Sequence, residues 1–169
     1  MLKRFFPELY VDSIYDVPYE RFYSEGKRNI VFDIDNTLVP FDIPEPTEEV
    51  LKLFEKLKLA GFNICLVSNN NERRVSKFNE NLKYGAIHKA GKPKLSGIRR
   101  AMEMIGAKPE NTVLIGDQVF TDVWCGNRCK IYTVLVRPIA NRDEFTVKLK
   151  RGAEKVVIRI YEKNIKQSK

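Results

Sequence analysis

The chain has 169 residues, a hydrophobic fraction of 43% and a formal net charge of +8 at pH 7. Its length fits one domain, and no apolar run approaches the roughly 20 residues that a membrane-spanning helix needs. Pro7, Glu8 and Asp12 interrupt the apolar residues near the N-terminus, which argues against a cleaved signal peptide. We therefore expect a single cytoplasmic domain over residues 1–169.

The first predicted elements follow an N-terminal arm that contains Pro7 and Pro18 and that we expect to be loop-like. Apolar segments bounded by polar or turn residues predict four buried strands, at 29–35, 62–70, 111–118 and 131–138. Helical spacing of apolar residues predicts helices at 44–61, 72–85, 96–110 and 120–129. The first helix has Thr47 as its expected N-cap and ends near Gly61, and residues 86–93 are expected to be extended. Strands that are apolar along their length and alternate with helices indicate an α/β fold, with a mostly parallel sheet covered on both faces.

The chain has three cysteines, Cys65, Cys125 and Cys129. Their number is odd, and they lie in or beside segments expected to form the core. We therefore expect packing thiols rather than disulfides or metal ligands.

Polar residues follow three of the predicted strands at their C-terminal ends. Asp33 and Asp35 end the first strand, Ser68 and Asn69 the second, and Asp117 the third. Ligands of open parallel sheets bind in the crevice outside these strand ends. The sequence therefore predicts one site to which three strands contribute.

Carboxylates gathered in one crevice repel each other unless a cation lies among them. Oxygen ligands suit Mg²⁺, and Asp33, Asp117 and Asp122 are the candidates. An aspartate can attack phosphorus to form an aspartyl-phosphate, and Asp35 is placed to protonate the leaving oxygen and then to activate water. Ser68, the backbone around Asn69 and a lysine would bind the phosphoryl oxygens.

Four motifs in order resemble those of the haloacid dehalogenase-like hydrolases. They are "DIDNT" at 33–37, "LVSNN" at 66–70, "GKP" at 91–93 and "GDQVFTD" at 116–122. With "SNNNERRV", "GDQVFTDVWCGNR" and the basic tail, the sequence is similar to the YqeG-type branch of the capless subclass IIIA. That branch is related to phosphatases that act on phosphatidylglycerophosphate. The resemblance implies a three-layer Rossmann-like core without a cap domain.

The same resemblance implies the roles of the acidic motifs. Asp33 would be the nucleophile, Asp35 the general acid/base, and Thr37 an orienting hydroxyl behind them. Asp117 would hold Mg²⁺ together with Asp33 and the backbone carbonyl of Asp35. Asp122 would support the metal site.

The phosphate-binding residues are implied in the same way. Ser68 would bind the phosphoryl group with support from Asn69, although both residues could instead cap the helix that follows. Lys92 would neutralise the phosphate and the nucleophile. Lys89 and Lys94 also lie within range, and Lys92 is favoured because proline follows it.

The C-terminal tail, about residues 148–169, carries +6 of the net charge of +8. Its apolar residues fall at helical spacing: Val156, Val157, Ile160, Tyr161 and Ile165. This pattern favours a helix that packs on the body, and an interfacial or anion-binding segment is the alternative.

Together these features predict a Mg²⁺-dependent phosphomonoesterase. The spacing from Thr37 to Ser68 and from Ser68 to Lys92 leaves no room for a cap domain, so a large substrate or a second subunit would have to cover the site. Combined with the basic tail, this favours a large or membrane-held phosphate. Mainly through the resemblance, a lipid phosphate such as phosphatidylglycerophosphate is favoured as the substrate, and peripheral contact with an anionic membrane is the matching expectation. A phosphatase for nucleic-acid ends or a phosphoprotein is the runner-up. A non-catalytic module that binds RNA, the ribosome or a GTPase is a second class, which the presence of both Asp33 and Asp35 disfavours.

Overall fold

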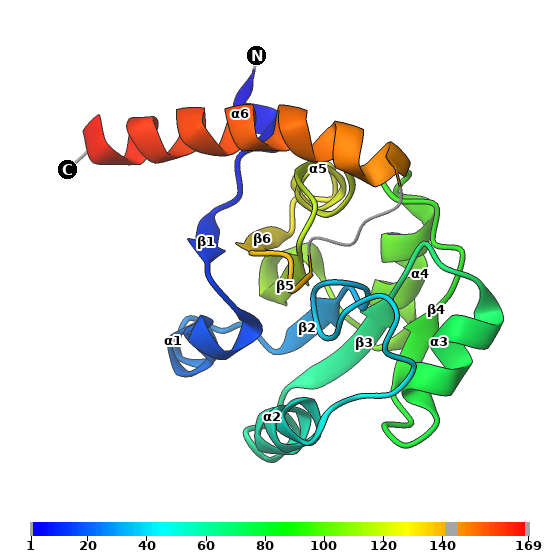
Figure 1. The fold of residues 1–169 in the computed structure, drawn as a ribbon. Helices are drawn as coiled ribbons and strands as arrows, with labels where there is room; N and C mark the ends of the chain where they lie inside the picture. Colours follow the sequence, from blue (N-terminus) through cyan, green and yellow to red (C-terminus); the bar gives the residue numbers. More distant parts are fainter. Residues whose placement is uncertain (1, 141–144, 168–169) are drawn as a thin grey trace.

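The computed structural model describes residues 2–140 and 145–167. Within these residues six strands form one sheet in the order β1-β6-β5-β2-β3-β4, and every neighbouring pair is parallel (Figure 1). The strands are β1 (Leu9–Val11), β2 (Asn29–Phe32), β3 (Asn63–Val67), β4 (Gly85–Ile87), β5 (Thr112–Gly116) and β6 (Tyr132–Val136). The predicted α/β class with a parallel sheet is confirmed.

Helices lie between successive strands, and one more helix follows the last strand. They are α1 (Tyr19–Ser24), α2 (Glu48–Leu59), α3 (Glu72–Asn79), α4 (Ser96–Met104), α5 (Trp124–Arg128) and α6 (Phe145–Gln167). Short helical turns are η1 (Leu2–Phe5), η2 (Ile14–Asp16), η3 (Pro109–Asn111) and η4 (Val119–Val123). The expected cap of α2 is present, because Thr47 Oγ accepts a hydrogen bond from the Val50 N–H at 3.3 Å.

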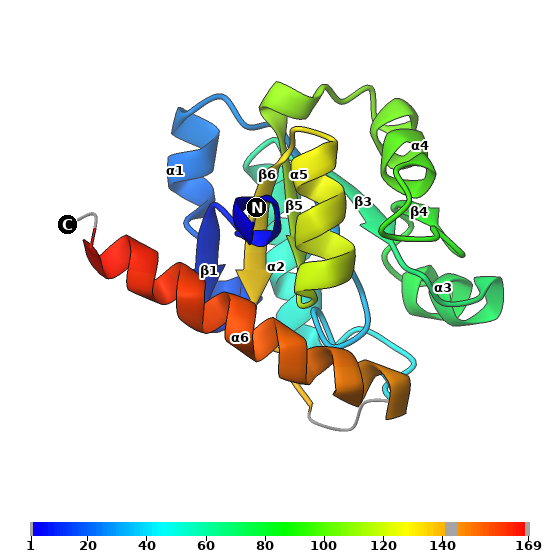
Figure 2. The same ribbon diagram turned by 90° about the horizontal axis from the view of Figure 1, so that it is seen from above.

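The sheet lies between two helical layers, because alternate residues of each strand point to opposite faces. On one face, Ile30, Phe32 and their neighbours pack with α1, α2 and α3. On the other face, Val31 and its neighbours pack with α4 and α5. Figure 2 shows this arrangement from above. The three-layer Rossmann-like core is therefore confirmed, with β2 between β3 and β5 at its centre.

The N-terminal arm is not loop-like as predicted. It forms η1, the edge strand β1 and α1, and β1 pairs with β6 through Leu9 to Val134 and Val11 to Val136. The prediction was wrong because three residues are too few to show a strand period, and parallel pairing with a strand over 120 residues away leaves no local pattern.

The tail forms the long helix α6, which runs across the outside of the molecule (Figures 1 and 2). Val157 and Tyr161 are buried, and Val157 packs with Val119, Val123 and Leu135. Glu154 is buried as well, and its carboxylate accepts a hydrogen bond from the Phe120 N–H at 3.2 Å. α6 is thus packed on the element that follows β5.

The predicted apolar stripe of the tail was partly wrong. Val156 is 53% exposed and Ile165 is 40% exposed, whereas Glu154 and the half-buried Ile158 face the body. Positions 154, 157, 158 and 161 follow helical spacing, so the buried face is rotated relative to the predicted one. Lys155, Arg159 and Lys163 are exposed. The other basic side chains of the predicted tail, at 148, 150, 151, 166 and 169, lie outside the side chains that the structure describes.

Within the described part of the chain, no helix combines the length and the apolar character needed to cross a bilayer. A single helix, α2, lies between β2 and β3, and α3 lies between β3 and β4. No additional domain is inserted at these two positions. The three cysteines are free thiols, as expected, and Cys65 and Cys125 are buried.

Candidate active site

The turn after β2 presents two carboxylates at the centre of the sheet edge. The Ile34 carbonyl accepts hydrogen bonds from the N–H groups of Thr37 and Leu38, at 3.2 and 2.9 Å. Asn36 takes a φ of 62°, a left-handed conformation that asparagine tolerates better than most residues. The turn leaves Asp33 buried, with 6% of its surface exposed, and Asp35 half-buried at the rim.

Lys92 lies between two buried carboxylates. Its Nζ is 2.6 Å from Asp33 Oδ1 and 2.6 Å from Asp122 Oδ1, and it also donates to the Val67 carbonyl at 3.1 Å. Lys89 and Lys94 are exposed instead. The structure therefore brings Lys92, rather than its two neighbours, into contact with the predicted nucleophile.

Asp122 reaches this lysine from η4, a one-turn π-helix between β5 and α5. The Asp122 carboxylate also accepts a hydrogen bond from the Gln118 N–H at 3.1 Å. Gly116 permits the approach, because a Cβ at that position would overlap the Asp122 carboxyl group. The predicted short helix at 120–129 is thus a π-turn followed by α5, a geometry that often occurs at functional sites.

Thr37 joins the two carboxylates that are predicted to hold a metal. Its hydroxyl lies 3.1 Å from Asp33 Oδ2 and 3.2 Å from Asp117 Oδ1. Ligand oxygens of Asp33, Asp117 and Asp122 all lie within 4.8 Å of one another, and all three residues are buried. An all-oxygen donor set of this kind suits Mg²⁺. These residues therefore fit a divalent cation.

Asn69 holds the backbone of Lys92. The Lys92 N–H donates to Asn69 Oδ1 at 2.7 Å, and Asn69 Nδ2 donates to the Lys92 carbonyl at 3.0 Å. Ser68 is buried, and its Oγ lies 3.3 Å from Asp35 Oδ2. The alternative that Ser68 or Asn69 caps α3 was wrong, because Asn71 is the N-cap and its Oδ1 accepts from the Arg74 N–H at 2.9 Å.

Asp35 has two further partners that sequence reasoning missed. Arg74 of α3 forms an ion pair with Asp35 Oδ1, with Nη2 at 2.9 Å and Nε at 3.0 Å. Asn70 Nδ2 donates to Asp35 Oδ2 at 3.2 Å. Asn70 and Arg74 both lie in the quoted "SNNNERRV" segment, so that motif was the signal that could have found them.

Burial and neighbouring charges together shift the pKa values of Asp33 and Lys92. Burial raises the pKa of Asp33 to about 7; Lys92 opposes this shift, and the Asp122 and Asp35 charges add to it. Burial alone would lower the pKa of Lys92, but the carboxylates of Asp122 and Asp33 outweigh it and raise that pKa. Lys92 is therefore an ammonium ion at neutral pH. A further cation near Asp33 would favour the ionised form of the Asp33 carboxyl group.

The predicted catalytic and phosphate-binding side chains open into one cavity of about 310 Å³. Asp33, Asp35, Ser68, Asn69 and Lys92 line it together. Asp117, Asp122 and Thr37 lie buried behind them. The cavity also has lining residues that were not predicted: Asn36, Phe41, Asn70, Gln118 and Thr121.

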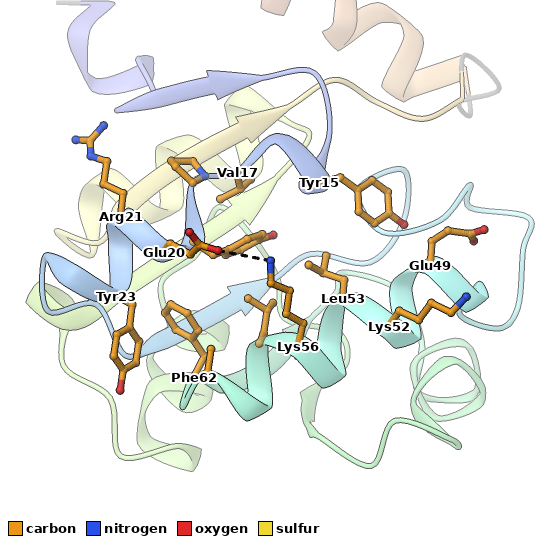
Figure 3. A pocket seen from close by; sticks show the side chains of 14 residues that line it. Tyr15, Val17, Glu20, Arg21, Tyr23, Glu49, Lys52, Leu53, Lys56 and Phe62 are labelled. Atoms are coloured by element: carbon orange, nitrogen blue, oxygen red, sulfur yellow. Dashed lines mark ion pairs between the residues drawn. The ribbon is translucent and has the colours of Figure 1, made fainter.

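A larger hollow of about 920 Å³ lies elsewhere, between α1 and α2 (Figure 3). Its lining is largely aromatic and aliphatic, including Tyr19, Leu53 and Phe62, and an exposed ion pair from Lys56 to Glu20 at 3.7 Å spans it. It contains none of the predicted catalytic residues. The smaller cavity is the candidate active site because of its chemistry rather than its size.

Comparison with known proteins identifies the family. The family model of the haloacid dehalogenase-like hydrolases matches residues 41–129. Among solved structures, the cobalt-bound deoxy-D-mannose-octulosonate 8-phosphate phosphatase of Haemophilus influenzae has a TM-score of 0.56 at 14% identity. The match covers 82% of this chain and 91% of that one. At this identity the likeness concerns the fold alone. The chain belongs to the haloacid dehalogenase-like hydrolases and is a phosphatase of that family.

Its relatives place it more narrowly. It is 40% identical over 159 residues to the protein named "Probable phosphatase YqeG" of Bacillus subtilis, covering 94% of this chain and 92% of that protein. It is 25% identical over 170 residues to the chloroplastic/mitochondrial phosphatidylglycerophosphate phosphatase 1 of Arabidopsis thaliana. That match covers 90% of this chain but only 47% of the plant protein. The predicted likeness to the YqeG branch is confirmed.

Proposed function

We propose that the protein hydrolyses a phosphate monoester through an aspartyl-phosphate on Asp33, with the help of Mg²⁺. The observation that carries the proposal is the contact of Lys92 Nζ with Asp33 at 2.6 Å, in a cavity that Asp35 and Ser68 also line. An ammonium ion beside the nucleophile would offset charge as an anionic phosphate enters. Asp33 and Asp117 would hold the cation, which supplies further neutralisation of phosphate charge when bound.

The protein's own residues would carry out two steps. In the first, an Asp33 oxygen attacks phosphorus, the bond to the leaving oxygen breaks, and Asp35 gives that oxygen a proton. In the second, Asp35 takes a proton from water as the water attacks phosphorus. This step releases inorganic phosphate and restores Asp33. Ser68 would donate a hydrogen bond to a phosphoryl oxygen, and the positive charge of Lys92 would neutralise the phosphoryl group and Asp33.

We expect hydrolysis of a generic aryl phosphate to require Mg²⁺ or a similar divalent ion. The reason is that Asp33, Asp117 and Asp122 are buried within 4.8 Å of each other, and a substrate phosphate adds more negative charge. The rate is measured after chelation and after readdition of metal, with the Asp33→Asn variant as the background control. Full activity in excess chelator would refute the metal requirement.

The substrate that we favour is a large or membrane-held phosphate, first of all a lipid phosphate such as phosphatidylglycerophosphate. The absence of an inserted domain between β2 and β4 supports this choice, since such a site needs its substrate to exclude water. The likeness to a plant phosphatase named for that lipid supports it too. Measuring kcat/KM on a panel of lipid, nucleotide, sugar and protein phosphates tests this choice. A higher kcat/KM for nucleic-acid ends or for phosphoproteins would favour one of those substrates instead.

The basic tail offers a test of the membrane version of the proposal, in which the substrate is held in an anionic membrane. Lys155, Arg159 and Lys163 are exposed on α6, and each basic residue near an anionic surface contributes about 1 kcal/mol. Changing all three to glutamine should lower binding to anionic vesicles about tenfold or more and slow hydrolysis of a vesicle-borne phosphate. A soluble aryl phosphate should be hydrolysed at nearly the normal rate, because none of the described side chains of α6, at 152–165, is among the cavity's lining residues.

A matched control changes three exposed basic residues elsewhere to glutamine: Lys58, Arg100 and Lys130. Co-sedimentation with vesicles at low and high salt, beside melting curves, measures binding and stability together. If the unmodified protein fails to bind anionic vesicles at low salt, the membrane version is eliminated.

A further inference from the structure

Arg74 lies beside the candidate acid/base and is largely shielded from solvent. Its side chain is 12% exposed, and that of Asp35 is 20% exposed. Two guanidinium nitrogens, Nε and Nη2, approach Asp35 Oδ1 at 3.0 and 2.9 Å. The third nitrogen, Nη1, donates to the Pro44 carbonyl at 3.0 Å. One side chain thus joins α3, the Asp35 carboxylate and the segment that leads into α2.

The second carboxylate oxygen is held independently of Arg74. Asp35 Oδ2 lies 3.2 Å from Asn70 Nδ2 and 3.3 Å from Ser68 Oγ. With donors on both oxygens, the plane of the Asp35 carboxylate is fixed from two sides. Arg74 supplies the shorter contacts: a hydrogen bond from Nε and an ion-pair contact from Nη2. Because both come from a charged group, we expect them to be the stronger ones.

The chain also fixes Arg74 itself. Asn71 caps α3 and binds the Arg74 N–H, which sets the first helical turn, and the guanidinium lies 5.5 Å from the centre of the Phe78 ring. A planar fork can contact Asp35 and Pro44 at the same time, whereas a lysine ammonium at the same position could not reproduce this geometry.

We propose that Arg74 is a positioning residue for Asp35: it orients the carboxylate that exchanges protons with the leaving oxygen and with water. This inference rests on the proposed phosphatase mechanism. Through Pro44, Arg74 also ties Asp35 to the segment that carries Phe41, a lining residue of the cavity. Arg74 is not itself among the cavity's lining residues, so its effect on the reaction passes through Asp35.

The test compares Arg74→Ala and Arg74→Lys with Arg73→Ala. Arg73 is the neighbouring arginine and is exposed, which makes it a matched control for charge and helix position. General acid–base catalysis contributes about 10²–10⁴-fold, so loss of its positioning should lower kcat for an aryl phosphate by about 10- to 100-fold. KM should change little in Arg74→Ala. Arg74→Lys should recover only part of kcat, and Arg73→Ala should stay within about twofold of the unmodified protein.

Chemical rescue separates positioning from a purely structural role. Low concentrations of guanidinium should raise kcat of Arg74→Ala, because the free cation can occupy the space beside Asp35. It should not raise kcat of Asp35→Asn or of Arg73→Ala. Melting curves of all variants show whether activity loss follows loss of folding.

Four results would count against the inference. One is a kcat of Arg74→Ala within twofold of normal, and another is an equal loss in Arg73→Ala. The third is a rise in KM at constant kcat, which would make Arg74 a substrate-binding residue. A folded variant that guanidinium fails to rescue also counts against it. If the unmodified protein hydrolyses no phosphate monoester, the proposed function fails. If the unmodified protein turns over the substrate and the Arg74 variants have the same kcat, only the inference about Arg74 fails.

Discussion

Asp33→Asn is expected to lower turnover of any phosphate monoester by at least about 10³-fold while the chain remains folded. The variant lacks the oxygen nucleophile, and loss of a nucleophile removes most of the rate enhancement that such a group supplies. Folding should survive because Lys92 keeps its contact with Asp122 at 2.6 Å and with the Val67 carbonyl. Steady-state assays and a melting curve on the same preparation test both statements.

The same variant should change how stability depends on pH when divalent ions are chelated. Burial raises the pKa of Asp33 from 3.8 to about 7. A carboxyl group whose pKa is raised by folding contributes stability at low pH, and the contribution is lost as the pH rises through the folded-state pKa. The unmodified protein should therefore lose this part of its stability between about pH 4 and about pH 7, and Asp33→Asn should not.

Urea unfolding in chelator across this pH range measures the difference. Addition of Mg²⁺ is the control, because a cation that binds the ionised site should reverse the loss in the unmodified protein. Near-normal turnover by the variant would place the nucleophile elsewhere. Identical pH slopes in both proteins would contradict the burial argument.

Lys92→Met is expected to remove activity and to destabilise the protein by about 3–5 kcal/mol, the usual cost of removing one partner of a buried ion pair. Lys92 is 6% exposed and contacts Asp33 and Asp122, so the substitution leaves both carboxylates without their ammonium partner. The pKa of Lys92 is raised by these carboxylates, although burial opposes them. Its stabilising charge is therefore fully present at neutral pH and is lost only when alkaline pH deprotonates it.

Lys89→Met and Lys94→Met are the matched controls, because both lysines are exposed and lie within three residues of Lys92. Each should change the free energy of unfolding by less than about 0.5 kcal/mol and leave turnover nearly normal. The double variant Lys92→Met with Asp122→Asn should regain part of the lost stability, because one unpaired buried carboxylate is gone, but it should stay inactive. If Lys89→Met or Lys94→Met removes activity while Lys92→Met does not, the substituted residue, rather than Lys92, is the active-site lysine.

Much of the fold could be predicted from the sequence because the central strands carry a local signal. Residues 30–32, 64–67 and 113–115 are apolar and buried on both faces, as expected for inner strands of a parallel sheet. Thr47 marked the start of α2 through its capping side chain. The edge strand β1 was missed because its pairing with β6 depends on a long-range contact that three residues do not reveal.

The tail illustrates the same limit in a helix. Helical periodicity was evident in the sequence, but apolar residues occur on more than one side of α6. Which side is buried depends on the surface that receives it, here Val119, Val123 and Leu135. A buried Glu154 on that side could not have been expected, because its partner is a backbone N–H of η4.

For the candidate site, the sequence by itself determined the chemical groups and the edge at which they meet. Asp33, Asp35, Ser68 and Asp117 follow buried strands, and the carboxyl ends of parallel strands share one edge. Only the tertiary structure decided which lysine contacts Asp33 and which side chain of α3 forms an ion pair with Asp35, namely Arg74. Both contacts join segments more than 35 residues apart, at distances near 3 Å or less, so they depend on how loops and helices pack around the sheet. Local residue patterns mark Lys92 and Arg74 as candidates, but they do not show which side chains these residues contact.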